Sequence, residues 1–289
     1  MLLDDNRIGR VRTVARGPLP PHPRVVHCRA DLCDPAARAA LDGVDVLWHL
    51  GAQLWRSRDG RQIAVNLDGT ENVAAARPAR IVFASSAAVY GAYPDNPLPL
   101  TEDTRPRPNA ACAYAWHKLE GERIVAEAAP AAVLRISAVL GPHADARVVR
   151  AAQGYALVVP AVDAPQAMQF LDEDDAAAGL LAAGLSRLTG IWNLAPADWL
   201  DEHDVARISG GRVVRVPLRV AVAASELGYH ARLLPFGADR SSLLGGPLAL
   251  DPARAATALG WVATRSSAAV LGDVLANPQG VQRYMRHVR

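Results

Sequence analysis

The stretch RIVFASSAAVYG, residues 80–91, joins an apolar segment directly to a pair of serines. Its first part, RIVFA at 80–84, is rich in β-branched and aromatic residues, which is typical of a buried strand. The segment AAVLRI at 131–136 has the same character. Between the two lies a helical segment from Tyr114 to Ala129, which Pro130 ends. A strand, a helix and a second strand in this order predict a parallel β-α-β unit.

The same alternation continues toward the N-terminus. Alanine-rich stretches with helical spacing lie at Pro35 to Leu41 and at Val65 to Ala76. Three more short apolar runs are predicted as strands, namely VRTVA (Val11 to Ala15), RVVHC (Arg24 to Cys28) and VDVLWHL (Val44 to Leu50). Strands and helices that alternate in this way predict an α/β fold, a Rossmann-like doubly wound parallel sheet.

Toward the C-terminus the alternation becomes looser. After Gly141-Pro142 a Pro-containing stretch runs to Pro165, and it is followed by a predicted helix from about Asp174 to Leu188 and a strand at Ile191 to Leu194. The last ninety or so residues hold Gly and Pro clusters between short helical segments. This part of the chain is therefore expected to form a smaller second lobe that closes over a site.

Composition excludes several classes of function. The chain has 289 residues, of which 51% are hydrophobic and 21% charged, and its formal net charge is +2 without any Lys/Arg block. Nucleic acid is therefore not an expected partner. No apolar run reaches the roughly 18 to 20 residues that span a bilayer, and two aspartates interrupt the first ten residues, so we expect neither a membrane segment nor a signal peptide.

The cysteines point to a reducing compartment and not to a metal. Three cysteines in a chain of this length make no disulfide framework, which favours a cytoplasmic protein. Cys28 and Cys33 lie near His22 and His27, but their spacing matches no zinc pattern, and no metal is expected.

Tyr114 and Lys118 are the residues whose spacing suggests chemistry. Residues four apart on a helix share one face. A tyrosine hydroxyl is a poor acid or base at neutral pH, and an ammonium beside it favours the phenolate. Such a tyrosine can exchange a proton with a carbonyl or alcohol while a hydride moves to or from a nicotinamide. Ser86, at the end of a predicted strand, is the candidate to hold the reacting oxygen, although a Tyr–Lys pair at this spacing is by itself weak evidence.

The order of several motifs makes this hypothesis much stronger. FASSAAVYG (83–91), YAWHK (114–118) and LRISAVLGP (134–142) follow one another as they do in one family. The chain resembles the extended short-chain dehydrogenase/reductases, the NAD-dependent epimerase/dehydratase family. Further matches are VVHCRADLCD (25–34), DVLWHLGA (45–52), NLDGTENV (66–73), QFLDEDDAA (169–177) and LDPARAATALGW (250–261).

The resemblance implies roles for individual residues. Tyr114 would be the acid/base, Lys118 would lower its pKa and hold the nicotinamide ribose, and Ser86 would bind the reacting oxygen. The other residues assigned to the cofactor side are Asp31 and Leu32 beside the adenine, Leu50, Gly51 and Ala52 after a strand, Asn66 on its helix, and Ser85 next to Ser86. Each has a plainer interpretation: Asp31 as the cap of a turn, Asn66 as a helix cap and Ser85 as a packing neighbour.

The resemblance also implies the domain organisation. Residues 1–140 together with about 164–195 would form the dinucleotide-binding lobe. Residues 141–163 and 196–289 would form the substrate-binding lobe. A homodimer that forms through the helices flanking the active site is the expected assembly.

One element of the family pattern is missing from the start of the chain. The family opens with a strand and a G-x-x-G-x-x-G turn that binds the pyrophosphate at a helix N-terminus. Here MLLDDNRIGRVRTVAR is predicted to be the tail of the helix after that turn, leading straight into the second strand, so about 25 to 30 residues of one strand-turn-helix unit are absent. A start codon placed too far downstream is the favoured explanation; a fragment and a natural variant that no longer uses the cofactor normally are the alternatives.

Cofactor preference is read from the residues after the second strand of the family pattern. An acidic residue there would accept hydrogen bonds from the ribose of NAD, but the chain has Ala15 and Arg16. Because an arginine suits a 2′-phosphate, NADP is favoured over NAD, unless Arg16 is an ordinary solvated loop residue. Binding of either cofactor by this chain is in doubt without the glycine turn.

The substrate class follows from one position in LRISAVLGP. Relatives that act on nucleotide sugars commonly carry an asparagine where this chain has Ala138. The sequence therefore favours an oxidoreductase that moves hydride between the nicotinamide and a carbonyl or alcohol of a small organic substrate. A nucleotide-sugar epimerase or dehydratase is the alternative within enzymes, and a catalytically impaired or non-enzymatic relative is the alternative outside them.

Overall fold

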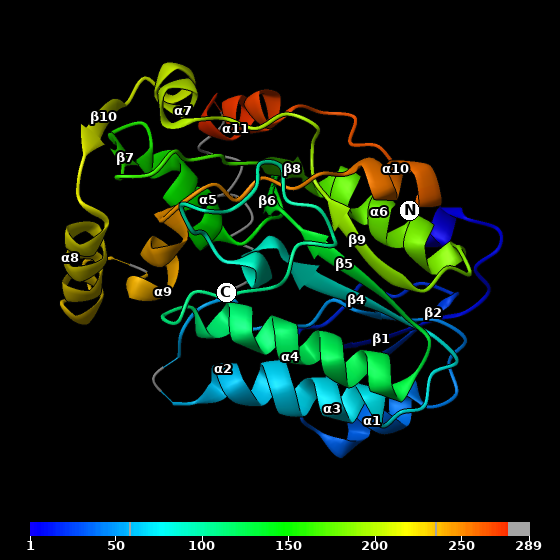
Figure 1. Ribbon diagram of the computed structural model, residues 1–289. Coiled ribbons are helices and arrows are strands. Elements are labelled where there is room, and N and C mark those ends of the chain that lie inside the picture. The colour runs from blue at the N-terminus through cyan, green and yellow to red at the C-terminus, as the bar shows by residue number, and fades with distance from the viewer. Residues whose placement is uncertain (58, 235, 277–289) are drawn as a thin grey trace.

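A four-stranded parallel sheet forms the centre of the molecule in the computed structural model, which describes residues 1–57, 59–234 and 236–276. The strands stand in the order β3 (Leu47–His49), β4 (Ile81–Ser86), β5 (Ala131–Ile136) and β9 (Gly190–Leu194). Helices cover both faces of this sheet (Figure 1). The predicted α/β, Rossmann-like architecture is confirmed, with strand ends within a few residues of the expected ones.

Alternation of side chains explains why both faces of the sheet are covered. On β4, Ile81 and Phe83 pack with the α4 (Ala113–Ala128) side chain Val125, whereas Val82 packs on the other face with α6 (Glu173–Leu185) and α10 (Ala253–Leu259). Successive residues of a strand point to opposite faces, so a continuous apolar run suits a strand that is buried on both sides.

Glycine allows α4 to approach the sheet closely. A Cβ atom added to Gly121 on α4 would lie 2.7 Å from Cζ of Phe83 on β4, closer than side chains normally pack. The small residue therefore sets the distance between the helix and the strand that together carry the candidate catalytic residues.

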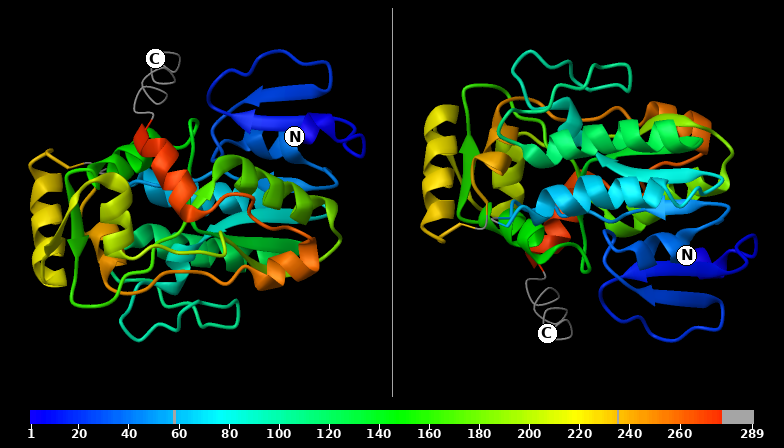
Figure 2. Two further views of the ribbon diagram at one scale, coloured as in Figure 1. Left: turned by 90° about the horizontal axis from the view of Figure 1, so that it is seen from above. Right: turned by 90° about the horizontal axis from the view of Figure 1, so that it is seen from below.

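The two N-terminal strands form a separate pair. β1 (Val11–Ala15) and β2 (Val25–Arg29) pair in parallel with each other, while β3 begins the four-stranded sheet, so in the described part of the chain the sheet is interrupted between them. Figure 2 shows this pair standing beside the main body. The expected helical tail before β1 is limited to one short 3-10 turn, η1 (Leu2–Asp4), after which Asp5 is already extended.

The helices between β2 and β4 are less regular than the sequence predicts. α1 (Pro35–Leu41) begins as expected, with Asp34 as its N-cap and proline at its first position. The predicted helix Val65 to Ala76 is instead three consecutive segments: α2 (Arg61–Ile63), the π-helical η2 (Ala64–Asp68) and α3 (Gly69–Ala74). The wider π turn carries Asn66, which is described below.

The second lobe contains more regular structure than the sequence indicates. Within the loosely patterned stretch after Gly141-Pro142 lie α5 (Ala146–Gly154) and β7 (Val158–Ala161), and β6 (Ala138–Leu140) lies just before it. β6 pairs with β8 (Phe170–Asp172), and β7 pairs with β10 (Arg212–Arg215). The remaining elements are η3 (Ala87–Tyr90), α7 (Glu202–Ser209), α8 (Leu218–His230), α9 (Ala238–Ser241), η4 (Ser242–Leu244) and α11 (Ser267–Ala276). The lobe boundaries given above stay a prediction, and residues 277–289 of the second lobe lie outside the described part.

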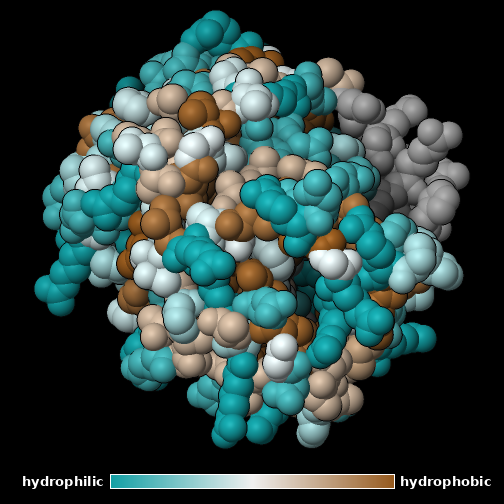
Figure 3. Space-filling model, turned by 90° about the vertical axis from the view of Figure 1, so that its right-hand side faces the viewer, coloured by the Kyte–Doolittle hydropathy of each residue, from teal (hydrophilic) through white to brown (hydrophobic). Residues whose placement is uncertain are grey.

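The surface shows polar and apolar residues intermixed. In Figure 3, hydrophilic side chains cover most of the visible face and hydrophobic ones are interspersed among them. Within the ranges that the structure describes, none of the helices combines the length and apolar character needed to cross a bilayer.

Candidate functional site

The candidate site lies at the carboxyl end of β4. Ser86 is the last residue of this strand, is half-buried, and its Oγ accepts a hydrogen bond of 3.2 Å from the backbone N–H of Ala88, which caps η3. Ligands of open parallel sheets bind beyond the carboxyl ends of the strands, so the position suits a ligand-binding serine.

Tyr114 and Lys118 converge on the same place from the first turns of α4. Their side chains are 8% and 4% exposed, respectively, and the Lys118 Nζ atom lies 5.8 Å from the centroid of the Tyr114 ring. Nζ donates a 2.7 Å hydrogen bond to the carbonyl of Ala84 on β4. The helix is therefore fixed to the strand at this level, with serine, tyrosine and lysine on one side of their interface.

Burial changes the proton affinity of both α4 groups. It lowers the pKa of Lys118 to about 8, against the opposing effect of the Glu122 charge. It raises the pKa of Tyr114, while the positive charge of Arg240 and hydrogen bonding with Ser86 act in the opposite direction. Burial disfavours the charged form of each group, because solvent no longer stabilises the charge. A partner of opposite charge must then provide that stabilisation.

Arg240 is a site residue that sequence reasoning missed. Its Cζ atom lies 4.9 Å from the centroid of the Tyr114 ring and 5.1 Å from that of Trp55. It lies on α9, far from Tyr114 in the sequence, and no motif around it marks it. Tertiary packing brings its charge to the tyrosine.

Part of the cofactor side assigned from the sequence is also assembled. A Cβ atom on Gly51 would clash with Leu32, so these two residues are in close contact, and Leu50 and Ala52 on either side of Gly51 are exposed. Burial acts to raise the pKa of Asp31, but the hydrogen bond from Cys33 and the charge of its ion-pair partner Arg61 outweigh it and lower the pKa.

Asn66 is buried and orders the loop after β3. Its Oδ1 accepts a 2.7 Å bond from the Gln53 backbone N–H, its Nδ2 donates 3.0 Å to the Gln53 carbonyl, and His117 Nδ1 is 3.4 Å from Nδ2. Through these contacts Asn66 connects the loop, η2 and α4. Its expected cofactor role stays a prediction.

Ser85 and Arg16 lie away from Tyr114. The Ser85 hydroxyl donates a 2.5 Å bond to Glu122, whose carboxylate also pairs with Arg135 at 2.8 Å. Ser85 and Ser86 are adjacent on a strand and so face opposite sides, which gives Ser85 a structural partner. Arg16 is exposed just after β1, where its backbone carbonyl accepts a bond from Arg29.

The described residues fit one half of a nicotinamide dinucleotide. Lys118 is almost fully buried and uses one of its three N–H donors on Ala84, so two remain for a ribose beside Tyr114. Within 1–57, 59–234 and 236–276, however, no glycine-rich turn joins a strand to a helix, so these ranges supply no pyrophosphate cradle. In the same ranges no cluster of three or more His, Cys, Asp or Glu side chains could hold a metal ion.

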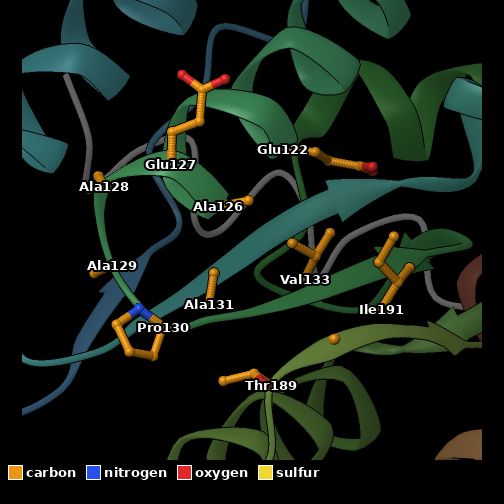
Figure 4. Close-up of a pocket in the computed structure, with 11 residues that line it drawn as sticks. Glu122, Ala126, Glu127, Ala128, Ala129, Pro130, Ala131, Val133, Thr189 and Ile191 are labelled. Carbon is orange, nitrogen blue, oxygen red and sulfur yellow. The ribbon is translucent and has the colours of Figure 1, made fainter.

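Two hollows flank the sheet at opposite ends. One of about 260 Å³ adjoins the triad through Ala87 and Leu243, and Leu243 packs against the cluster that contains Tyr114. The larger, of about 670 Å³, lies at the amino ends of β5 and β9 (Figure 4). Figure 4 shows it lined largely by small side chains, with Glu127 turned away from the strands. Only the smaller one is placed for chemistry at Tyr114.

Comparison with solved structures agrees with this fold. MoeE5 in complex with UDP-glucuronic acid and NAD aligns with a TM-score of 0.70 at 20% identity, over 95% of this chain and 91% of that one. A UDP-glucuronic acid 4-epimerase from Bacillus cereus in complex with NAD aligns at 0.68 and 20% identity, over 96% and 93%. A short-chain dehydrogenase/reductase superfamily protein from Agrobacterium tumefaciens with bound NAD aligns at 0.66 and 24% identity, over 96% and 92%.

Curated relatives are similarly distant. An uncharacterized protein, y4nG, of Sinorhizobium fredii is 27% identical over 86% of this chain, and the uncharacterized protein Rv0501 of Mycobacterium tuberculosis is 28% identical over 67% of it. The chain spans 67% of the length of the first and 56% of the second. Residues 2–195, which include the whole of the candidate triad, match the family described as NAD dependent epimerase/dehydratase. The chain therefore belongs to the NAD-dependent epimerase/dehydratase family.

Proposed function

We propose that the protein is a nicotinamide-dependent oxidoreductase that interconverts a carbonyl and an alcohol on a small organic substrate. The observation that carries the proposal is the convergence of Ser86, Tyr114 and Lys118 at the end of β4, next to a mainly apolar cavity. Family membership supports redox chemistry at this position, and Ala138 supports a substrate other than a nucleotide sugar.

Each of the three residues has a separate task. The Ser86 hydroxyl holds the substrate oxygen beside the phenol. Tyr114 gives a proton to that oxygen in reduction and takes it back in oxidation, helped by the positive charges of Lys118 and Arg240, which favour the phenolate. Lys118 would also hold the nicotinamide ribose, and the bound nicotinamide supplies or accepts the hydride.

Removal of the phenol hydroxyl tests this assignment directly. With NADPH and a panel of small ketones, we expect wild-type protein to consume NADPH and Tyr114→Phe to be slower by about 10²- to 10⁴-fold, the usual contribution of a general acid. NADPH affinity, measured by nicotinamide fluorescence, should change little. Equal turnover of the two proteins would refute the role of Tyr114, and the absence of saturable NADPH and NADH binding to wild type would refute the function.

Arg16 supports a preference for NADP. It is exposed at the end of β1, on the same side of the molecule as Asp31, whose pKa its charge helps to lower. An exposed guanidinium can pair with a 2′-phosphate, whereas Asp31 already has Arg61 as a partner. We expect Arg16→Ala to weaken NADPH binding and to leave NADH binding unchanged; equal effects on both would contradict this preference.

A nucleotide-sugar epimerase or dehydratase is the second candidate. It is favoured by the likeness to structures solved with UDP-glucuronic acid, or UDP-glucose, and NAD. The same triad would then act in a transient oxidation with no net change of the cofactor. Isomerised or dehydrated UDP-sugar in place of net NADPH consumption would establish this alternative.

A further inference from the structure

The cavity of about 260 Å³ beside the triad has mainly apolar walls and a few polar side chains. Most of its lining is apolar and comes from both lobes, including Leu140, Val148, Phe170 and Leu248. Ligand sites typically combine such walls with a few polar groups that fix orientation, and they span about 300–1,000 Å³ for drug-sized molecules. A cavity just below this range suits a small compound.

Hydrogen-bonding atoms without partners are concentrated here. Eight buried side-chain atoms in the described ranges have no hydrogen-bond partner, and three of them belong to residues that line this cavity: Ser137 Oγ, Gln166 Oε1 and Arg240 Nε. Ser137 and Gln166 are 7% and 5% exposed, so water reaches them poorly. An unpaired buried polar group destabilises the protein, and a ligand that pairs with all three atoms would remove this cost.

The chemistry of each atom specifies what the ligand must offer. Gln166 Nε2 donates to the carbonyl of Leu244, which can only accept, so the amide orientation is settled and Oε1 is free to accept from a hydroxyl or N–H. Arg240 Nε can only donate, and it therefore requires an oxygen acceptor. Ser137 can do either.

The environment of Arg240 favours an acceptor that is charged. Its Cζ atom lies over the rings of Tyr114 and Trp55, and one Nη atom donates to the carbonyl of Leu54. The carboxylate of Asp239 forms an ion pair with Arg240, but the 3.9 Å between its Oδ2 and Nε is too long for a hydrogen bond. The guanidinium is thus held in place while its Nε–H remains unpaired, and carboxylates are the acceptors with which arginine forms its strongest hydrogen bonds.

We propose that the cavity selects small, mainly apolar organic acids, whose carboxylate binds Arg240 and which carry a hydroxyl or N–H, separate from the oxygen that Ser86 would hold, that meets Gln166. The inference rests on the proposed function only for the identity of the reacting group. Arg240 would then have two tasks, because its charge both orients the substrate and acts on Tyr114.

Calorimetric titration without any nicotinamide tests the recognition step. Mandelate supplies an apolar ring, a hydroxyl and a carboxylate, and its methyl ester has nearly the same shape without the charge. We expect wild type to bind mandelate more tightly than the ester. Arg240→Gln should weaken mandelate binding by about 10- to 100-fold, the value of a hydrogen bond to a charged group, and leave ester binding unchanged.

Arg147→Gln is the matched control. Arg147 also lies over the Trp55 ring, at 5.4 Å, but it is exposed and does not line the cavity, so both probes should bind this variant as they bind wild type. Arg240→Lys keeps the charge and should lose less affinity than Arg240→Gln. The proposal fails if wild type binds neither probe, or if Arg240→Gln remains folded and binds mandelate as wild type does or loses both probes equally. Because no turnover is measured, a failure of Tyr114→Phe to slow catalysis would refute the proposed function and not this result.

Discussion

The candidate site residues come from two parts of the molecule that differ sharply in burial. We call them the catalytic end, formed by β4, β5 and α4, and the N-terminal end, formed by β1, β2 and the residues beside them. At the catalytic end, Ile81 and Val82 of β4 are fully buried. At the N-terminal end, every residue of β1 and β2 is at least partly exposed. Both ends also carry an ion pair: Glu122–Arg135, 8% and 3% exposed, and Asp31–Arg61, 30% and 43% exposed. A carboxylate–guanidinium pair is therefore buried in a low-dielectric environment at the catalytic end and partly exposed to solvent at the N-terminal end.

The two halves of the site therefore do not have equal structural support. The proton-transfer residues are held by a sheet buried on both faces. The residues assigned to the adenosine side rest on a two-stranded pair, an arrangement that is at best marginally stable by itself. We expect substitutions at the first end to affect global stability and those at the second to affect it little.

Breaking the buried ion pair should have the largest effect. Glu122→Ala leaves the Arg135 guanidinium uncompensated inside the protein, and we expect about 3–5 kcal/mol loss of unfolding free energy in urea. Glu120→Ala on the same helix is the control, because Glu120 pairs with Arg123 on the surface and such pairs contribute about 0–1 kcal/mol. Similar losses in the two variants would show that the interior pair is hydrated.

The same substitution, valine to alanine, compares how much β4 and β2 contribute to the free energy of unfolding. Val82→Ala, on β4, should cost about 2–3 kcal/mol, since it removes buried methyl groups and leaves a cavity. Val26→Ala on β2 should cost less than about 0.5 kcal/mol because Val26 is 52% exposed. Chemical denaturation of both variants gives the comparison, and a larger loss for Val26→Ala would reverse our view of the two ends.

His49, on β3 between the two ends, makes stability depend on pH. Burial and the nearby charge of Lys118 lower the pKa of His49 to about 3. The unfolded chain takes up a proton near pH 6.5 and the folded one does not, so this contribution is present above pH 6.5 and is lost as the pH falls toward 3. We expect wild type to lose about 2 kcal/mol more than His49→Gln between pH 7.5 and 5.

Urea unfolding at the two pH values measures this difference. His203→Gln is the matched control, because His203 is exposed on α7. This variant should lose as much unfolding free energy between pH 7.5 and 5 as wild type does. If wild type and His49→Gln lose equal stability, His49 is accessible to protons in the folded state.

The exposed ion pair should give the smallest effect. In a double-mutant cycle of Asp31→Asn and Arg61→Gln, we expect a coupling free energy below about 1 kcal/mol, which should fall further in 0.5 M salt. A coupling as large as that expected for Glu122 would mean that the β1–β2 end is better shielded than its exposure indicates.

Local patterns predicted the central elements well. The apolar runs around Val14 and Val133 define β1 and β5, whose bounds are those expected, and Pro130 ends the helix before β5 as expected. The segment from residue 141 to residue 165 was predicted poorly. β7 and β10 are short and partly exposed, so their stability depends on pairing with each other across about fifty residues of sequence, and such pairing leaves little trace in a local pattern.

The alternation of strands and helices could be read from the amino-acid sequence, because periodicity acts over a few residues. The order of the motifs around Ser86, Tyr114 and Lys118 carried the resemblance to the family. The surroundings of these three residues depend on the folded structure. Folding places Arg240 of α9 over the Tyr114 ring, directs Ser85 to Glu122, and leaves three polar atoms without hydrogen-bond partners around one apolar cavity. Charge and burial at a site depend on contacts between residues that are distant in the chain, and these contacts exist only once the chain has packed.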